Sequence, residues 1–166
     1  MQIKDYHPKY AKEVTQLIYD TIWAINCKDY TKEQLAVWAE NFKNLEKWNQ
    51  SLCDHYALVA IKNERIVGFG DIDKKGYLDR LYTHKDYQKI GIATKLCNLL
   101  EQSAQQDTIT THASITAQGF FAKRGYATIK SKVSYAIISI YLILLCRKIS
   151  VDSTPKREII CVFYPR

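Results

Sequence analysis

The spacing of apolar residues changes along this 166-residue chain, and this limits the fold to one that combines helices with a sheet. From Val14 to Ile25, apolar residues recur every three or four positions, which is typical of an amphipathic helix. From residue 56 to 83, β-rich runs alternate with short turns, which indicates antiparallel strands. Helix and strand patterns then alternate up to residue 125, which predicts a parallel step with crossover connections.

Each pattern predicts one element. A short strand is expected at 3–6 and a helix at 14–25, and Thr31 with Gln34 forms a capping box at the start of a second helix that reaches residue 42. The later elements are strands at 56–61, 65–71, 77–83 and 109–114, and helices from residue 92 to about 105 and from 116 to 123, with Gly125 as the C-cap. The predicted fold class is α/β (α+β), with a mixed, mainly antiparallel central sheet and helices on both faces.

The length corresponds to one domain, residues 1–166, but the last part differs in composition. Residues 133–146 are almost entirely apolar, and no glycine follows Gly125. A run of 14 residues is too short to span a bilayer. It is expected to form a long buried or interface strand, or two strands in one run. The alternative is an unusual replacement of an ordinary C-terminal hairpin. If exposed, it would form an edge for aggregation or dimerisation.

Charge and cysteine content exclude several classes of protein. The net charge is +7, but residues 1–125 carry 17 Lys and Arg against 15 Asp and Glu, so the excess lies near the C-terminus. Without a dense basic run or a stacking motif, no nucleic-acid partner is expected. Five cysteines without a C-x-x-C pair argue against a metal site or a disulfide framework and suit a cytoplasmic protein. The charged N-terminus has no secretory signal, and no membrane partner is expected.

The segment from Gln88 to Ala93 carries the clearest chemical signal, because a strand ends, a short loop holds Gly91 and a helix begins at once. Such a junction offers unpaired backbone N–H groups at the positive end of a helix dipole, and these can bind a pyrophosphate. Gly91 removes a Cβ that would keep a phosphate away from the backbone, and Lys89 adds positive charge. The alternative is that Gly91 only begins a helix.

Two segments resemble the GNAT superfamily of acyl-CoA-dependent N-acetyltransferases. Residues 81–93 are similar to the family's strand, connector and Arg/Gln-x-x-Gly-x-Gly/Ala pyrophosphate loop, and residues 117–126 are similar to the helix-to-strand segment behind the coenzyme. The resemblance covers about residues 1–130, so the region 131–166 is atypical. Residues 29–39 also resemble a group of small, uncharacterised bacterial acetyltransferases.

The resemblance implies acetyl-CoA as co-substrate and no metal. Backbone amides of the loop would hold the pyrophosphate, main-chain groups of Leu81 and Thr83 would pair with the pantetheine arm, and the opening between strands 77–83 and 109–114 would deliver the thioester. The residues expected to bind the coenzyme are Leu81, Tyr82, Thr83, Gln88, Lys89, Ile90, Gly91, Ile92, Ala93, Thr94 and Phe121.

Acetyl transfer also needs a general base for the acceptor ammonium. Strand alternation puts Asp79 on the same face as Leu81 and Thr83, and Arg80 on the other face, so Asp79 is the candidate base. The alternative is a surface carboxylate paired with Arg80. His112, on the neighbouring strand, is a weaker candidate because a lone strand histidine is more often structural.

The proton donor departs from the family pattern. Many members protonate the leaving thiolate with a tyrosine, and the matching position here is Phe121, which cannot donate. Ser114, Tyr126 and water are left as candidate donors.

The acceptor pocket is expected between the first two helices, at Trp23, Asn26, Asp29 and Tyr30, whereas Trp38 is expected in the core. The sequence therefore favours an N-acetyltransferase that moves an acetyl group from acetyl-CoA to a primary amine of a small molecule or peptide, by direct attack in a ternary complex. The alternative is a catalytically weak or inactive acyl-CoA-binding protein with a dimerising C-terminal region. A homodimer is left open by both.

Overall fold

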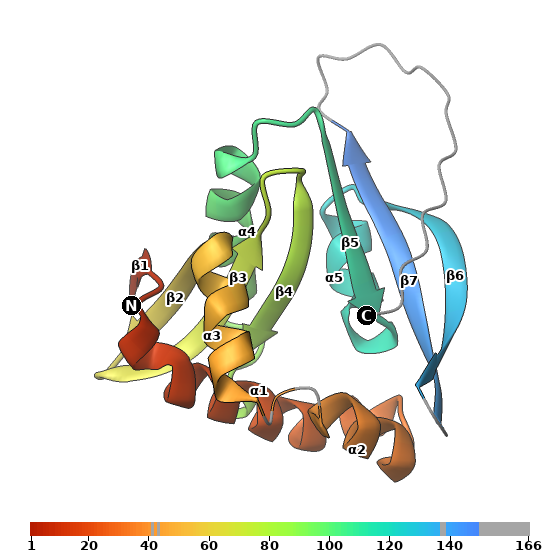
Figure 1. Cartoon of the computed structure of the whole chain (residues 1–166). Helices are drawn as coiled ribbons and strands as arrows, with labels where there is room; N and C mark the ends of the chain where they lie inside the picture. Colours follow the sequence, from red (N-terminus) through yellow and green to blue (C-terminus); the bar gives the residue numbers. More distant parts are fainter. Residues whose placement is uncertain (41, 43, 137–138, 150–166) are drawn as a thin grey trace.

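In the part of the chain that the computed structural model describes, seven strands form one sheet in the order β1-β2-β3-β4-β5-β7-β6 (Figure 1). The described residues are 1–149 except 41, 43, 137 and 138, and the described side chains end at residue 129. Every neighbouring pair is antiparallel except β4 and β5. The strands are β1 (Gln2–Asp5), β2 (Tyr56–Lys62), β3 (Arg65–Ile72), β4 (Tyr77–Thr83), β5 (Thr108–Ser114), β6 (Ala127–Ala136) and β7 (Ser139–Ile149).

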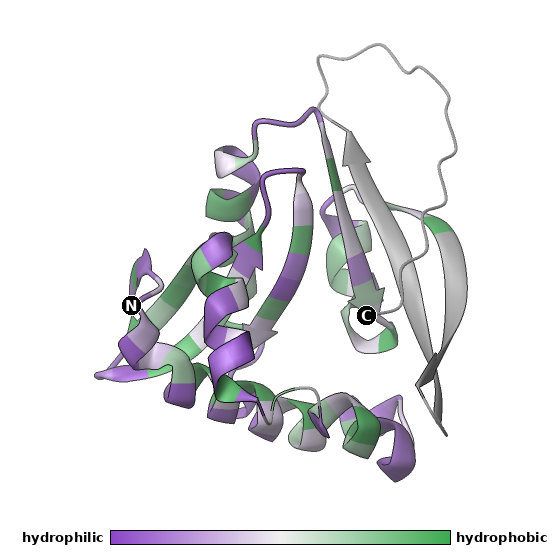
Figure 2. Ribbon diagram, viewed as in Figure 1, coloured by the Kyte–Doolittle hydropathy of each residue, from purple (hydrophilic) through white to green (hydrophobic). Residues whose placement is uncertain are grey.

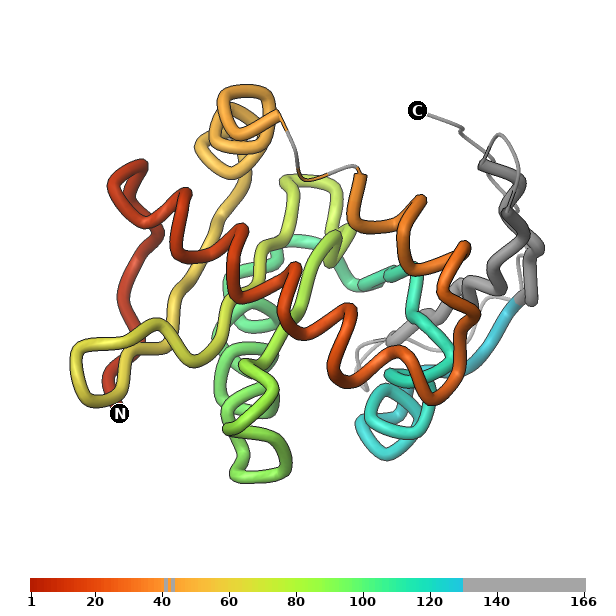
Figure 3. Tube along the Cα trace, turned by 90° about the horizontal axis from the view of Figure 1, so that it is seen from below, coloured from red at the N-terminus to blue at the C-terminus, as the bar shows by residue number. Residues whose placement is uncertain are grey.

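Helices cover both faces of this sheet, which confirms the predicted fold class (Figures 1 and 3). One face carries α1 (Ala11–Ala24), α2 (Lys32–Glu40) and α3 (Leu45–Asp54). The other face carries α4 (Ile92–Ser103) and α5 (Ile115–Lys123). Within the described residues, the connections also contain the short 3-10 helices η1 (Pro8–Tyr10), η2 (Asn26–Lys28) and η3 (Lys85–Tyr87).

Each layer of helices has its own apolar core. On one side, Val14, Ile18 and Ile22 of α1 pack with Trp48 of α3 and Phe69 of β3. On the other side, the buried side chains of α4 pack on β3, β4 and β5, and they include Ile92, Leu96 and Leu100.

Gly68 lets α4 lie directly on β3. A Cβ at this position would collide with Cγ2 of Ile92 and would lie 3.1 Å from Cδ1 of Leu96. Because Ile92 is the first residue of α4, the absence of a side chain at Gly68 sets how closely the start of this helix approaches the sheet.

The sequence predicted two helices before residue 56, and the structure has a third, α3. Its only buried residues are Trp48 and Leu52, and its other positions are largely polar, so the apolar stripe is narrow. Figure 2 shows the hydrophilic residues of α3 on the side that faces away from the sheet. The start of α3 carries a recognisable signal, because the Asn44 side chain caps it by accepting from the Lys47 N–H at 2.9 Å.

The apolar run of residues 133–146 is divided between β6 and β7, which form a hairpin. Strand β7 also pairs with β5 along the whole of Thr108–Ser114, so the run completes the sheet. Of the two readings of this run, two strands is the correct one. Residues 150–166 of the predicted single domain lie outside the described part. Among the described residues, no helix is both long and apolar enough to cross a membrane.

Candidate active site

The two parallel strands β4 and β5 pair only near the start of β4. Their register includes Tyr77 with Thr110 and Leu78 with Thr111, and beyond these residues the strands separate (Figure 1). Strand β7 pairs with the other edge of β5, so it does not close the opening between β4 and β5. A cavity of about 550 Å³ lies at this opening, and β4, β5, α1, α2, α4 and α5 all contribute to its wall.

The edge of β4 along this cavity presents backbone hydrogen-bonding groups. The N–H of His84 donates to the carbonyl of Val67 on β3 at 3.0 Å. Since main-chain groups alternate along a strand, those of Leu81 and Thr83 point the other way, toward the opening. The carbonyl of Thr83 already accepts from the Thr21 hydroxyl at 3.2 Å and from the Gln88 side-chain amide at 2.5 Å. The main chain of Leu81 and the N–H of Thr83 thus face the cavity.

The loop between η3 and α4 forms the end of the cavity nearest that helix. Lys89 and Gly91 both have left-handed backbones, with φ of +61° and +84°. Ile90 between them does not have a positive φ. When left-handed residues alternate with others in this way, successive backbone N–H groups turn toward one concave side, which is a geometry that binds anions. No side chain caps α4, and the first hydrogen bond of the helix runs from the Lys95 N–H to the Gly91 carbonyl. The amides of residues 92–94 therefore have no partner within the helix.

Gly91 stands at the open side of this loop. A Cβ there would meet no protein atom within 4 Å, so the positive φ, and not a neighbouring side chain, is what requires glycine. The space beside its backbone is open to a ligand. The predicted loop residues all line the cavity except Ile90, whose side chain is directed outward and is 54% exposed.

Asp79 lies in the cavity wall, but not through simple strand alternation. Asp71 pairs with Arg80 and Ile72 pairs with Leu78, so Asp79 is an extra residue in a β-bulge. The prediction that Asp79 shares a face with Leu81 is therefore wrong: Leu81 packs with Leu78 against the core beneath α4, whereas the Asp79 carboxylate lies next to Arg80 and close to Asp71. Asp79 lines the cavity and is also 3.3 Å from the Arg80 guanidinium, so the two alternatives for this carboxylate occur together. Burial raises the pKa of Asp79, and the charge of Arg80 opposes that rise.

Arg80 is fixed from several sides. Its Nε and Nη2 donate to the two oxygens of the fully buried Asp71 at 2.8 and 2.6 Å. Asp71 also hydrogen-bonds His55 Nδ1 at 2.6 Å, and this bond raises the pKa of His55. His55, Asp71 and Asp79 bring ligand-type atoms within 4.8 Å of one another. Both carboxylate oxygens of Asp71 already accept hydrogen bonds from Arg80. The Arg80 guanidinium is therefore the group that supplies positive charge next to these carboxylates.

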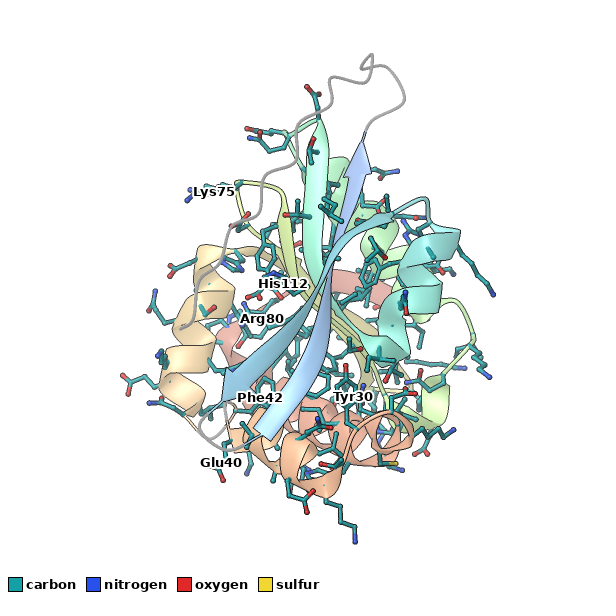
Figure 4. All side chains as sticks on the ribbon, turned by 90° about the vertical axis from the view of Figure 1, so that its right-hand side faces the viewer. Tyr30, Glu40, Phe42, Lys75, Arg80 and His112 are labelled. Atoms are coloured by element: carbon teal, nitrogen blue, oxygen red, sulfur yellow. The ribbon has the colours of Figure 1, made fainter. Side chains whose placement is uncertain are left out.

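A second polar pair bridges the two separating strands. The Tyr77 hydroxyl lies 2.8 Å from His112 Nδ1, and the two rings meet edge to face. Burial raises the pKa of the Tyr77 phenol above its ordinary value. His112 lines the cavity, and Figure 4 shows it with Arg80 on the side of the sheet where α3 lies.

The three residues considered for protonation of the leaving thiolate lie in different places. Ser114 lines the cavity at the end of β5, and its oxygen caps α5 by accepting from the Ala117 N–H at 3.2 Å. Phe121 is buried in the cavity wall. Tyr126 is buried outside the lining, against Phe121, and its hydroxyl donates to Glu101 at 3.0 Å. The structure therefore corrects the expectation for Tyr126, because its hydroxyl is held away from the cavity.

Comparison with known proteins identifies the family of this chain. A family model described as an acetyltransferase (GNAT) domain matches residues 26–140. The chain belongs to this GNAT family. It is an N-acetyltransferase, and the general reaction of the family is acetyl transfer from acetyl-CoA.

Individual relatives agree with this membership. The chain is 29% identical over 133 residues to the uncharacterized N-acetyltransferase YafP of Escherichia coli strain K12, covering 80% of this chain and 85% of that protein. A crystal structure of a GCN5-related N-acetyltransferase from Rhodopseudomonas palustris superposes with a TM-score of 0.86 at 26% identity, covering 89% of this chain and 94% of that one. The PaiA N-acetyltransferase of Thermoplasma acidophilum, solved with coenzyme A, has the same fold, with a TM-score of 0.69 at 17% identity and coverage of 90% and 99%.

The predicted acceptor residues of this GNAT domain separate into two groups. Asn26 is buried and lines the cavity, and its side-chain amide donates to the Thr116 hydroxyl at 3.0 Å. Asp29 accepts from the same hydroxyl at 2.7 Å, and the Tyr30 hydroxyl accepts from the Ile115 N–H at 2.8 Å. Asp29, Tyr30 and Trp23 are outside the cavity lining. The contacts of Asp29 and Tyr30 instead attach the segment between η2 and α2 to the start of α5 (Figure 4 labels Tyr30).

Among the residues that line the GNAT cavity, Trp38 and Arg80 were not predicted as site residues. Trp38 was expected in the core, but it lines the cavity while also packing edge to face on Tyr30. Arg80 was considered only as the partner of Asp79. Its signal was the basic residue next to Asp79 together with Asp71 on the preceding strand, but only the pairing register brings the three together.

Proposed function

We propose that this chain transfers an acetyl group from acetyl-CoA to a primary amine of a small molecule or peptide, by direct attack within a ternary complex. The observation that carries the proposal is the continuity of one cavity, which joins the loop amides of residues 88–94 to the carboxylate of Asp79 through the opening between β4 and β5. A phosphate site and a base at the two ends of one opening are what direct transfer requires.

The residues present fit the coenzyme. The amides of residues 92–94 and the open space beside Gly91 suit a pyrophosphate, and Lys89 adds a positive charge at the same loop. The exposed edge of β4 at Leu81 and Thr83 can pair with an amide-containing arm as an added strand would. When bound, acetyl-CoA supplies the thioester carbonyl that is attacked. The complex of coenzyme A with PaiA supports this assignment.

In the proposed reaction, Asp79 receives the proton of the acceptor amine. The amine nitrogen forms a bond to the carbonyl carbon, the carbon–sulfur bond breaks, and the thiolate takes up a proton. Burial brings the pKa of Asp79 upward, toward the range in which a base works efficiently. We assign protonation of the thiolate to Ser114 or to water, because Phe121 has no donor and the Tyr126 hydroxyl is bound to Glu101.

The acceptor is proposed to enter from the side of α1 and α2. Asn26 and Trp38 line that end of the cavity and offer an amide and an aromatic face. An aromatic face can hold a cationic or apolar group next to the amine. A homodimer and a cytoplasmic location remain predictions from the sequence.

The second candidate is the catalytically weak acyl-CoA-binding protein, which Phe121 favours because it carries no hydroxyl at the family's tyrosine position. Thiol release from acetyl-CoA, measured with a panel of primary amines, separates the two. Transfer in a ternary complex predicts initial-rate lines that intersect when both substrates are varied. Binding of acetyl-CoA without any acetylated product would instead favour the second candidate.

The role of Asp79 is tested with Asp79→Asn. Loss of the base should reduce kcat by roughly 10²- to 10⁴-fold while the affinity for CoA stays the same. Asp107→Asn is the matched control, because Asp107 is exposed and outside the cavity lining. Equal turnover of the Asp79 and Asp107 variants would remove Asp79 as the base.

A further inference from the structure

Helix α3 supports the cavity wall from outside the cavity. It supplies Ser51, whose hydroxyl accepts from Arg80 Nη2 at 3.0 Å, and Trp48, whose ring lies 4.8 Å from the guanidinium carbon of Arg80. His55, directly after α3, hydrogen-bonds Asp71. Helix α3 thus holds the two charged residues next to Asp79, although it contributes no residue to the cavity lining.

These contacts leave Arg80 little freedom. Its side chain is 11% exposed, it makes two hydrogen bonds to the fully buried Asp71, and it stacks on Trp48. Such a bidentate pair fixes both the position and the plane of a guanidinium. Asp79 differs from this rigid group, because its side chain is 34% exposed, it sits in a bulge, and it forms its ion pair with Arg80 through one carboxylate oxygen.

We propose that Arg80 is a positioning residue for acetyl transfer: fixed by Asp71 and α3, it holds the carboxylate of Asp79 at the cavity wall in its ionised form, ready to accept the proton of the amine. This inference rests on the proposed role of Asp79 as base. It also assigns a function to α3, the helix that the sequence did not predict.

The charges around Asp79 determine the direction in which each of them shifts its pKa. Burial and the negative charge of Asp71 both raise the pKa of Asp79, whereas Arg80 and, more weakly, His55 lower it. Several titratable or charged groups surround Asp79. Strand β3 and the turn after it supply Asp71 and Asp73, β4 supplies Tyr77, Arg80 and Tyr82, and His55 follows α3. His112 of β5 is hydrogen-bonded to Tyr77. Arg80 is the permanent cation among them.

Two substitutions should move Asp79 in opposite directions. Arg80→Gln removes the nearest positive charge and should raise the pKa of Asp79 by roughly one to three units. Asp71→Asn removes a negative charge and releases Arg80 toward Asp79, so it should lower that pKa. General damage to the fold would not produce shifts of opposite sign. Arg80→Lys keeps the charge without the bidentate geometry and should give a smaller rise than Arg80→Gln.

The shifts are measured directly by following the side-chain carboxyl carbon of Asp79 by NMR during a pH titration, with Asp79→Asn to assign the signal. Arg124→Gln is the matched control, since it breaks the partly buried ion pair with Glu101 outside the cavity lining, at 2.9 Å. It should leave the Asp79 titration unchanged. Unchanged titration in Arg80→Gln, or shifts of the same sign in Arg80→Gln and Asp71→Asn, would overturn the proposal.

This readout does not depend on turnover, so it separates two kinds of failure. If the shifts occur but the wild-type protein acetylates no amine, Arg80 sets the state of Asp79 and the proposed function is wrong. If the wild-type protein is active but the acid limb of kcat/KM stays in place in Arg80→Gln, the positioning role is wrong. We expect this limb to move to higher pH by the same amount as the NMR titration.

Discussion

Replacing Gly91 with glutamate should block coenzyme binding at a small cost in stability, and Gly125→Glu provides the control. Both glycines are exposed and have a φ of +84°, and at both a Cβ would meet no protein atom within 4 Å. An L-residue forced into this conformation loses about 1–2 kcal/mol. Each variant should therefore lower Tm by roughly 2–8 °C, as 1 kcal/mol corresponds to about 2–4 °C in a domain of this size.

The two variants should differ in their affinity for CoA. Only Gly91 lies in the cavity wall, beside the amides that begin α4. A carboxylate about 5 Å from one phosphate charge costs about 3 kcal/mol at an effective dielectric of about 20, which corresponds to a loss of affinity of over 100-fold. Calorimetric titration with CoA measures this loss, and Gly125→Glu should bind as the wild type does. If the two variants bind CoA equally well, the loop of residues 88–94 is not the phosphate site.

Two further predictions concern stability. Gly68→Ala should cost about 1–3 kcal/mol in denaturant unfolding, because the new methyl group collides with Ile92 and pushes the start of α4 off β3; an unchanged midpoint would show that α4 can shift freely. The bond to Asp71 raises the pKa of His55, so its contribution is complete below about pH 6.5 and is lost as pH rises through the folded-state value. Wild-type Tm should therefore fall relative to that of His55→Gln from about pH 6.5 upward, and parallel curves would contradict the assigned pKa direction.

The sequence predicted the elements whose signals are local. The apolar stripe of α1 and the reciprocal bonds of Thr31 and Gln34 depend only on residues three or four apart, and both are confirmed. The loop of residues 88–94 could be located because a glycine directly before an apolar helix indicates a special backbone conformation. Its φ of +84° confirms that reason.

What the sequence could not show depends on contacts between distant segments. The bulge at Asp79 arises from the register of β3 and β4 and changes which side chains share a face, so strand alternation wrongly placed Asp79 on the face of Leu81. The bonds from Asp29 and Tyr30 to α5 join residues 85 or more positions apart, and no local pattern distinguishes them from acceptor contacts. Helix α3 was missed because only two of its residues are buried.

The most direct test of the central claim, that acetyl-CoA binds along β4 with its pyrophosphate at the start of α4, is a titration of the ¹⁵N-labelled protein with CoA followed by amide NMR. We expect the largest shifts at the amides of Leu81, Thr83, Lys89 and residues 91–94, with saturation at one equivalent. Largest shifts elsewhere, or no shifts at millimolar CoA, would contradict it.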